Sequence, residues 1–545
     1  MKRVFGNTSG LKANHIRRLE NLYRRRVSPE FLISYELARD VTRLSHEIRR
    51  QIGLLIDRMG KIAYVIAGDH QRIVIPDISQ YRATTPGRLK GLRCLHTHLN
   101  NEPLTGDDLT DLAFLRLDIM AAVTITGEGL PHQIHMGHIL PGGSQNTPYE
   151  ILPPLSPNQL DIGCLELIQA IEDELAQLRA LYDADTGKER ALLVSVTTAP
   201  RRIAMESLAE LEELVLSGGI TVVETVLQQR KAVDSRFLIG RGKLQELAIL
   251  ALRKGATVIV FDQELNPSQM RSITDQTDMK IIDRTQLILD IFAQRAQTRE
   301  GKLQVELAQL KYLLPRLITK NTAMSRLTGG IGGRGPGETK LEINRRRVRD
   351  RITRLTKALS LVRKQRKQQK TRRDKKGLPV ISIIGYTNAG KSTLLNTLTK
   401  SSVLAESRLF ATLDPSSRRL RFPRDTEVII TDTVGFIKDL PKDLMVAFRA
   451  TLEELESADL LLHVVDISNP RFEAQIRSVE RILTDLDLND IPGICVLNKQ
   501  DLVEKEAIAP LIRSLDGIAI SAKDRSTLIP LIEKMEGMIQ RPDQR

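Results

Sequence analysis

The most regular pattern of apolar and polar positions lies between residues 303 and 362. Before a glycine-rich segment at 328–338, leucines recur at spacings of four and three, the pattern of helices that pack along a shared seam. After it, apolar residues follow at spacings of seven, four, three, four and three. The two sets are Leu303, Leu307, Leu310, Leu314 and Leu317, and Leu341, Val348, Ile352, Leu355, Leu359 and Val362. We expect an antiparallel helical hairpin with the glycine-rich loop at its tip; two independent core helices are the alternative.

The first 190 residues alternate short apolar runs with turn residues. This pattern indicates an α/β or α+β domain, preceded by a basic arm. A Pro- and Gly-containing stretch predicts a linker after it. The predicted segments are the arm at 1–26, strands at 61–67, 72–75, 92–98 and 119–125, helices at 29–51 and 107–117, and the linker at 141–158.

Beyond Leu192, four apolar runs alternate with helical segments, which indicates a small parallel sheet with crossover helices. The runs occupy residues 192–196, 220–226, 257–262 and 279–283. Within this region Gly240-Arg241-Gly242-Lys243 is too short for a phosphate-binding loop, and we interpret it as an ordinary turn. Whether this domain holds a second nucleotide stays open.

An apolar strand beginning at Val380 runs directly into a glycine-rich loop and then an apolar helix. The loop is Gly385-Tyr386-Thr387-Asn388-Ala389-Gly390-Lys391-Ser392, with Thr393 next in the helix. Strand, loop and helix in this order form the context of a phosphate-binding loop, whose backbone N–H groups point at phosphates. We expect Lys391 to reach the β and γ oxygens and the Ser392 hydroxyl to ligate Mg²⁺.

Three further segments follow in the order that phosphate-loop GTPases require. They are Asp432-Thr433-Val434-Gly435, Asn498-Lys499-Gln500-Asp501 and Ser521-Ala522-Lys523. Asp432 is expected to hold Mg²⁺ through water, and the Gly435 N–H to meet the γ-phosphate. The Asp501 carboxylate can accept the N1–H and N2–H of guanine, which adenine cannot offer, so GTP rather than ATP is predicted. The backbone of the last segment is expected to approach guanine O6.

Between the phosphate loop and Asp432 lies a predicted switch loop, Phe410-Ala411-Thr412-Leu413-Asp414. Its Thr412 hydroxyl is placed to close over Mg²⁺ and the γ-phosphate, so Ser392 and Thr412 are the predicted metal ligands. Ser407, Ser416 and Ser417 are alternatives for this hydroxyl. The predicted catalytic groups are Lys391, Thr412 and Gly435.

The residue after Gly435 departs from GTPases that orient water with a glutamine, because it is Phe436. An apolar side chain cannot polarise water, so hydrolysis by the chain alone is expected to be slow. The missing group could come from a partner or from a monovalent cation. Asn388 occupies a loop position that can help to hold K⁺; the alternative is that it only hydrogen-bonds within the loop.

With these motifs, the chain is expected to be an α/β multidomain protein with a C-terminal P-loop GTPase domain built on a mixed, mostly parallel sheet. Its 545 residues allow several separate cores. The predicted domains are the basic arm (1–26), an N-terminal α/β extension (27–140), a linker and helix (141–190), a small α/β domain (191–283), the hairpin with its basic second helix (284–376) and the GTPase domain (377–545).

Charge is concentrated in the second hairpin helix, where sixteen Lys and Arg stand against two Asp between Arg345 and Lys376. Because this density suits a polyanion, we expect contacts with nucleic-acid phosphates. Aromatic residues make up 3% of the chain and there is no Trp, which disfavours base stacking. The chain has no signal-peptide pattern or apolar run long enough for a membrane span, and its three cysteines have no metal or disulfide spacing.

Two histidines and an aspartate, His96, His98 and Asp108, have a spacing that resembles the zinc triad of JAMM-type metalloproteases. The resemblance implies an MPN-like N-terminal scaffold. The acid that such enzymes need is missing, because Arg50 stands at its place and Glu47 lies one helical turn too early. Peptidase chemistry is therefore not expected, and whether the three residues bind metal stays open.

Long segments from Leu192 to Lys523 resemble the HflX family of ribosome-associated GTPases. They include FLIGRGKLQEL, GGIGGRGPGETKLEINRRRVRDRI and FATLDPSSRRL. The resemblance implies a GTPase that uses Mg²⁺, docks on the large ribosomal subunit and its rRNA, splits or rescues ribosomes under stress, and is stimulated by them. It also implies a cytoplasmic protein, at membranes only through ribosomes, and a monomer off the ribosome. An RNA-binding scaffold gated by nucleotide is the alternative function.

Overall fold

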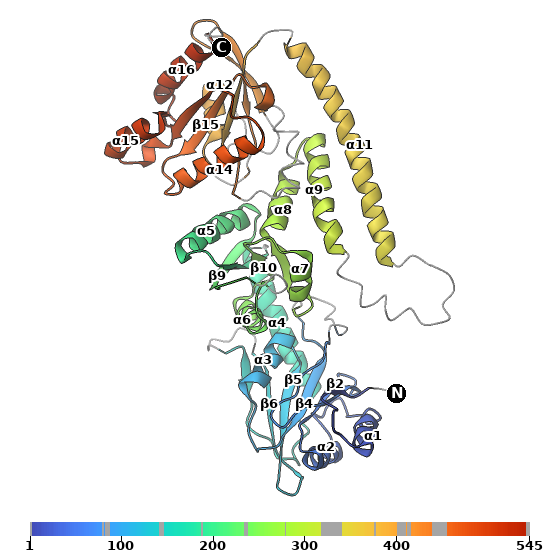
Figure 1. Cartoon of the computed structure of the whole chain (residues 1–545). Coiled ribbons are helices and arrows are strands. Elements are labelled where there is room, and N and C mark those ends of the chain that lie inside the picture. The colour runs from blue at the N-terminus through green and yellow to red at the C-terminus, as the bar shows by residue number, and fades with distance from the viewer. Residues whose placement is uncertain are drawn as a thin grey trace. The chain divides into compact units, whose positions relative to one another are not determined.

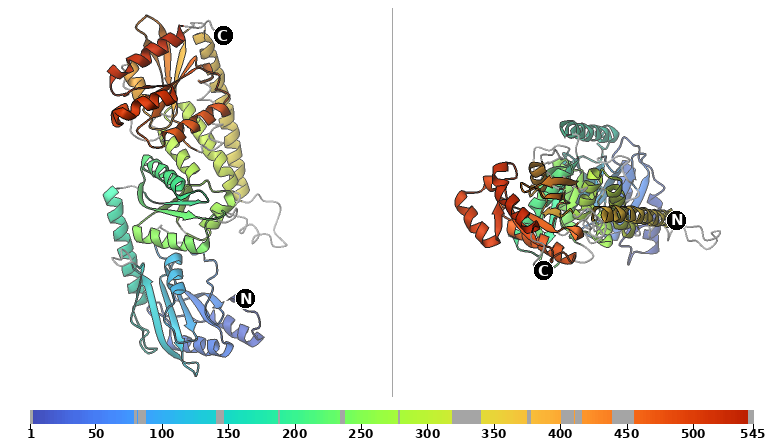
Figure 2. Two further views of the ribbon diagram at one scale, coloured as in Figure 1. Left: turned by 60° about the vertical axis from the view of Figure 1, so that its left-hand side comes forward. Right: turned by 90° about the horizontal axis from the view of Figure 1, so that it is seen from above.

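The computed structural model describes residues 3–78, 81, 88–140, 147–186, 189–233, 238–277, 279–317, 340–374, 378–399, 410, 416–438 and 455–540. The chain divides into two compact units. One contains residues 1–201, 221–260 and 268–281, and the other contains residues 202–220, 261–267 and 282–545. Figure 1 shows the elements, and Figure 2 gives two further views.

The first unit contains a seven-stranded sheet with the order β1-β3-β2-β4-β5-β6-β7. Its strands are β1 (Phe5–Gly6), β2 (Ile52–Asp57), β3 (Ile62–Ala67), β4 (Leu92–His98), β5 (Ile119–Ile125), β6 (Pro131–Ile139) and β7 (Tyr149–Ile151). Its helices are α1 (Ala13–Leu22), α2 (Tyr35–Ile48), α3 (Gly106–Leu115) and α4 (Cys164–Thr186). β4 pairs with β2 antiparallel and with β5 parallel, so the sheet is mixed.

The two faces of this sheet are covered by different helices. Successive side chains of a strand point to opposite faces. Thr97 in β4 shares a hydrogen bond of 2.7 Å with Ser45 of α2, whereas its neighbours His96 and His98 lie beside Asp108 of α3. All three β4 side chains are buried. Side chains of the sequence LHTH therefore pack on both faces of the sheet.

Several predictions for this region were wrong in detail. The predicted arm at 1–26 is part of the fold, because β1 pairs with β3 and Leu19 and Leu22 of α1 are buried. The predicted helix at 29–51 is shorter, since Ser34 caps the N-terminus of α2. Residues 72–75 form no strand, and β7 lies within the predicted linker at 141–158 and pairs with β6.

A second sheet has four strands in the order β11-β10-β8-β9. These are β8 (Arg190–Thr197), β9 (Thr221–Gln229), β10 (Val258–Phe261) and β11 (Lys280–Asp283), and they coincide closely with the four predicted runs. β8 and β9 are parallel. The helices that alternate with them along the chain are α5 (Arg201–Ser217), α6 (Arg241–Lys254) and α7 (Pro267–Thr274).

The hairpin helices are α9 (Arg299–Leu317) and α11 (Lys340–Asp374), preceded by a separate helix, α8 (Arg284–Arg295). α9 and α11 run antiparallel and side by side (Figures 1 and 2). The predicted seam is present, because Leu307, Leu355 and Leu359 form a buried cluster. Arg351 and Glu306 add a bidentate ion pair across the helices, with distances of 2.7 and 2.8 Å. The glycine-rich loop lies outside the described residues.

The C-terminal domain is built on a six-stranded sheet with the order β13-β14-β12-β15-β16-β17. Its strands are β12 (Val380–Gly385), β13 (Ser416–Arg421), β14 (Glu427–Asp432), β15 (Leu460–Asp466), β16 (Gly493–Asn498) and β17 (Gly517–Ala519). Only β13, at the edge, is antiparallel to its neighbour. The mixed, mostly parallel sheet of the prediction is therefore confirmed.

Helices cover both faces of this sheet. α12 (Lys391–Thr399) and α16 (Ile529–Ile539) share one apolar core, and α14 (Phe472–Asp485) and α15 (Lys505–Leu515) share another. In such a doubly wound sheet, ligands bind at the carboxyl ends of the parallel strands. All the predicted nucleotide-binding segments follow carboxyl ends of these strands, apart from the switch loop at 410–414.

Candidate functional site

The phosphate loop joins the end of β12 to the start of α12, as predicted. Lys391 is the first residue of the helix, and its Nζ donates a hydrogen bond of 2.7 Å to the Tyr386 carbonyl. Its side chain is buried. Burial lowers the pKa of Lys391 to about 8, and the charge of Asp432 opposes this shift. A polyanionic phosphate chain would restore the preference for the charged ammonium.

Asn498 at the end of β16 connects the phosphate loop with the segment 521–523. Its Nδ2 donates to the Ala389 carbonyl over 2.7 Å, and its Oδ1 accepts the Ala522 N–H over 2.9 Å. Gly390 makes this approach possible. Its φ is +95°, and an added Cβ would lie 2.2 Å from the Asn498 amide nitrogen. The Asn498 side chain therefore joins the two loops.

A hydroxyl and a carboxylate meet where β14 ends. The Ser392 hydroxyl donates to Asp432 Oδ2 over 2.6 Å, and Asp432 is fully buried. Both groups offer oxygen atoms, which are the ligands that Mg²⁺ prefers. The residues present therefore fit a magnesium ion.

Phe436, at the position of the missing glutamine, lies buried against the phosphate loop and is 2% exposed. Its N–H donates to the Gly385 carbonyl over 3.1 Å, and its carbonyl accepts the Thr387 N–H over 2.8 Å. Gly435 before it is tightly enclosed, because an added Cβ would lie 2.9 Å from Lys391 Nζ. This backbone pairing fixes Gly435 beside the loop.

The segment after β16 turns sharply. Lys499 has a φ of +67°, and its Nζ forms an ion pair of 2.6 Å with Asp466. The Gln500 N–H donates to the Ile520 carbonyl over 3.1 Å, which aligns this segment with Ser521. The Asp501 side chain is exposed at the surface of the same turn.

The remaining predicted residues differ in burial. The buried ones are Thr387, Thr433, Val434, Ser521 and Ala522. Gly390 and Thr393 are partly exposed, and Lys523 and Asn388 are exposed, Asn388 with a φ of +62°. Ala411, Thr412, Leu413 and Asp414 lie outside the described residues. Phe410 is buried and packs edge-on against Phe292 of α8, with ring centroids 4.5 Å apart.

A buried polar network behind the phosphate loop was not predicted from the sequence. The Tyr386 hydroxyl donates to Glu210 of α5 and accepts the Lys438 N–H over 2.7 Å. Arg284, the first residue of α8, forms ion pairs with Glu210 over 3.0 Å and with Asp262 over 2.9 Å. Burial lowers the pKa of Arg284, but its two carboxylate partners raise it further, so the guanidinium stays charged.

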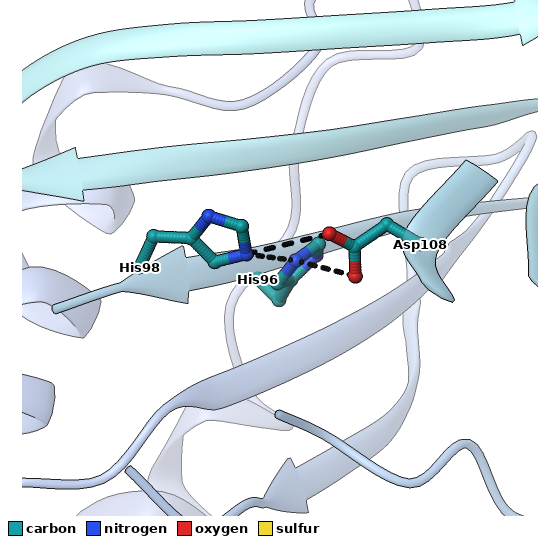
Figure 3. Close-up of side chains that lie close together, drawn as sticks. All are labelled: His96, His98 and Asp108. Atoms are coloured by element: carbon teal, nitrogen blue, oxygen red, sulfur yellow. Dashed lines mark hydrogen bonds and ion pairs between the residues drawn. The ribbon is translucent and has the colours of Figure 1, made fainter. Parts of the chain in front are cut away.

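The three residues that resemble a zinc triad also come together (Figure 3). His96 and His98 are buried in β4, and Asp108 lies in the first turn of α3. Burial would raise the pKa of Asp108, but hydrogen bonds with both histidines hold it well below the usual range. Glu47 does not join them, because its carboxylate pairs with Arg18 and, over 3.1 Å, with His15.

Three family descriptions match consecutive parts of the chain. They are "GTP-binding GTPase N-terminal" at residues 205–293, "GTP-binding GTPase Middle Region" at 295–373 and "50S ribosome-binding GTPase" at 380–535. None of the helices in the described ranges is long and apolar enough to cross a membrane.

The chain is 49% identical over 349 residues to GTPase HflX of Caldanaerobacter subterraneus subsp. tengcongensis, an alignment that covers 64% of this chain and 80% of that protein. It is 46% identical to GTPase HflX of Escherichia coli (strain K12), covering 59% and 76%. A solved GTP-binding protein of Sulfolobus solfataricus in complex with GDP is 25% identical, covering 65% and 99%, with a TM-score of 0.36. From the sequence relatives, this chain belongs to the HflX family of GTPases and hydrolyses GTP.

Proposed function

We propose that the chain couples GTP binding and hydrolysis to docking on the large ribosomal subunit, and that this docking splits or rescues ribosomes under stress. The observation that carries the proposal is the combination of a basic helix, α11, with a guanine-nucleotide domain in one compact unit. The family description matching residues 380–535 names ribosome binding, which supports the same partner. The cytoplasm is the compartment that this partner implies.

We assign the nucleotide roles from the sequence motifs. Lys391 would bind the β- and γ-phosphates, Ser392 and Thr412 would hold Mg²⁺, and Gly435 would contact the γ-phosphate. Mg²⁺ supplies neutralisation of charge on the phosphates when bound. Asp501 selects guanine through two hydrogen bonds, and the backbone of Ser521 to Lys523 surrounds O6. The 2.6 Å contact between Ser392 and Asp432 supports the magnesium assignment.

Hydrolysis is slow in the isolated chain. Phe436 has no polar group, is buried and is paired with the phosphate loop through its backbone, so it cannot orient a water molecule. The large subunit supplies the missing group. Asn388, exposed on the phosphate loop, is a candidate K⁺ ligand beside the phosphates.

The surface that contacts rRNA is proposed to be the basic strip of α11, defined by Arg347, Arg349, Arg354 and Lys357. These four side chains are exposed, and α9 covers the opposite, leucine-containing side of the helix. Such a strip binds phosphates with an affinity that falls steeply with salt. The chain acts as a monomer when it is not on the ribosome.

The domain built on the seven-stranded sheet is called the N-terminal unit below. For this unit we propose an MPN-like scaffold without peptidase activity. Glu47, the acid one helical turn before the expected position, forms ion pairs with His15 and Arg18 at the surface. Arg50 donates to the Asn7 and Ser9 carbonyls and provides no base. We therefore expect isopeptide-linked substrates to remain uncleaved when they are incubated with the protein.

Binding to purified large subunits tests the docking proposal. The variant R347E/R349E/R354E is compared with R477E/R513E/K534E, a matched charge reversal in the GTPase domain at Arg477, Arg513 and Lys534. We expect co-sedimentation with a non-hydrolysable GTP analogue to weaken only in the first variant, and the salt dependence of its remaining binding to have a slope lower by about 2–3. Equal binding of both variants would refute the basic strip as the contact.

A further inference from the structure

The N-terminal unit contains a cluster that the GTPase function does not use. His96 Nε2 lies 2.8 Å from His98 Nε2 and 3.2 Å from Asp108 Oδ1, and His98 Nε2 lies 3.5 Å from Asp108 Oδ2 (Figure 3). Both histidine rings are at most 1% exposed, and the Asp108 side chain is 13% exposed. Three potential ligand atoms therefore converge on one small region in the interior.

The spacing of these atoms agrees with tetrahedral zinc coordination. With metal–ligand distances of about 2.0–2.1 Å, neighbouring ligands in a tetrahedron lie about 3.3 Å apart. The separations of His96 Nε2 from His98 Nε2 and from Asp108 Oδ1 lie within about half an ångström of that value, and one ligand atom from each of the three residues lies within 4.8 Å of the others. Two imidazoles and one carboxylate also suit Zn²⁺ better than Mg²⁺ or Ca²⁺, because those two ions favour oxygen ligands alone.

The groups around the cluster orient its ligand atoms. His98 Nδ1 lies 2.9 Å from the Glu102 carbonyl, which can only accept, so this nitrogen carries the proton and Nε2 presents a lone pair. Asp108 Oδ2 accepts from the Thr105 N–H and hydroxyl over 2.8 and 2.7 Å. Oδ1, the oxygen nearer His96, is therefore the atom available to a metal.

The elements that carry the ligands are held independently of any ion. β4 lies in the middle of the seven-stranded sheet between β2 and β5. Thr105 and Asp108 form a capping box that fixes the start of α3. A metal would join this helix end to the central strand, so the site would stabilise the N-terminal unit.

We propose that His96, His98 and Asp108 form a structural binding site for one divalent transition-metal ion, best suited to Zn²⁺. The fourth position is taken by water. The ion pins the N-terminus of α3 to β4 and activates no water for hydrolysis, because Glu47 is held elsewhere by His15 and Arg18. The alternative is a metal-free triad in which one proton lies between the two Nε2 atoms.

The test uses the full-length chain, stripped with a chelator and then saturated with GDP and Mg²⁺ so that the nucleotide site is filled. Zn²⁺ alone is added, and bound metal is counted by mass spectrometry after gel filtration. We expect one Zn²⁺ per chain and a rise in the melting temperature of the N-terminal unit. Co²⁺ in its place should show the intense visible absorption of four-coordinate cobalt.

Two variants probe the ligands, and one serves as a matched control. Asp108→Asn and His98→Gln are expected to lower Zn²⁺ affinity by more than about 100-fold, since loss of an outer-shell partner alone costs about 10–100-fold. His138→Gln removes a buried histidine of β6 in the same sheet, whose Nε2 lies 3.7 Å from Glu150, and should bind Zn²⁺ like the wild type.

The proposal would be overturned if the folded wild-type chain retained no zinc. It would also be overturned if the Asp108→Asn variant bound zinc as well as the wild type does, and either result would favour the metal-free triad. If a ligand variant fails to fold, measurements on the wild-type chain alone test the proposal. Zinc-dependent stabilisation and the cobalt spectrum must then both appear, and the absence of either one contradicts the site.

Discussion

Tyr386→Phe removes one hydroxyl from the buried network that joins the phosphate loop to α5. That hydroxyl donates to the Glu210 carboxylate and accepts the Lys438 N–H over 2.7 Å. Burial and then the charge of Glu210 raise the pKa of Tyr386 far above its usual value, so the hydroxyl keeps its proton at every working pH. The substitution leaves the ring in place and tests the hydrogen bonds alone.

The magnitude follows from the two contacts. A hydrogen bond to a charged group contributes about 1.5–3 kcal/mol, and a buried N–H left without a partner costs about 1–3 kcal/mol. Glu210 keeps its ion pair with Arg284 after the substitution, which limits the loss. We therefore expect destabilisation of about 2 kcal/mol, a change of about 4–8 °C in the melting temperature of this unit.

The functional effect should concern GTP more than GDP. Lys438 lies three residues beyond Gly435, and releasing its N–H loosens the segment that we propose contacts the γ-phosphate. We expect GTP affinity to fall by about 3–10-fold relative to GDP affinity, equivalent to about 1 kcal/mol. Binding of fluorescent GTP-analogue and GDP, with thermal unfolding, measures both effects.

Tyr312→Phe is the matched control. The Tyr312 hydroxyl also donates to a buried carboxylate, Asp283, over 2.6 Å, but Tyr312 belongs to the helix α9 and not to the phosphate loop. It should destabilise the chain by a similar amount and leave the ratio of GTP to GDP affinity unchanged. Identical ratios for the two variants would refute the coupling of Tyr386 to the γ-phosphate segment.

Four other predictions follow from the described residues. Asp501→Asn should weaken GTP binding by at least about 100-fold and favour xanthosine triphosphate, whereas Asp485→Asn on α14 should not; unchanged GTP affinity would defeat the guanine assignment. Because nucleotide phosphates raise the lowered pKa of Lys391, GDP affinity should be constant below pH 7 and fall by about 5–10-fold by pH 9, with proton uptake visible by calorimetry in buffers of different ionisation enthalpy; no uptake would contradict the lowered pKa. Leu355→Ala, at 2% exposed, should destabilise the hairpin by about 2 kcal/mol or more, and Leu361→Ala, at 62% exposed, by less than about 0.5 kcal/mol. If Asn388 helps to bind K⁺, hydrolysis should be faster in KCl than in NaCl, and this difference should vanish in Asn388→Ala; equal rates in the two salts would rule the cation out.

Features encoded by contiguous residues could be predicted from the sequence. β5 coincides with its predicted strand because it is a nearly continuous apolar run buried on both faces. β4 also coincides with its predicted strand and is fully buried, although its sequence, LRCLHTH, contains polar residues. β6, with the sequence PHQIHMGHI, was missed because its histidines and glutamine dilute the apolar signal. The predicted strand at 72–75 contains three successive apolar residues yet is a loop, and Ile73 of this loop lies against Gly53 of β2.

The residues of the candidate site also differ in whether the sequence could predict them. The phosphate loop, Asp432 and Asn498 are local motifs, and the structure brings them together. Glu210 lies 176 positions from Tyr386, and nothing in its own neighbourhood distinguishes it from the other acids of α5. Its role depends on burial next to Arg284, which is a property of the tertiary packing.

GTP hydrolysis measured with and without purified large ribosomal subunits tests the central claim most directly. Phe436 leaves the isolated chain without a group to orient water, so the account predicts a low rate alone and a rise of about a hundredfold or more with saturating subunits. The R347E/R349E/R354E variant should keep the low rate and lose the stimulation. A rate that large subunits leave unchanged would contradict the account and favour an RNA-binding scaffold gated by nucleotide.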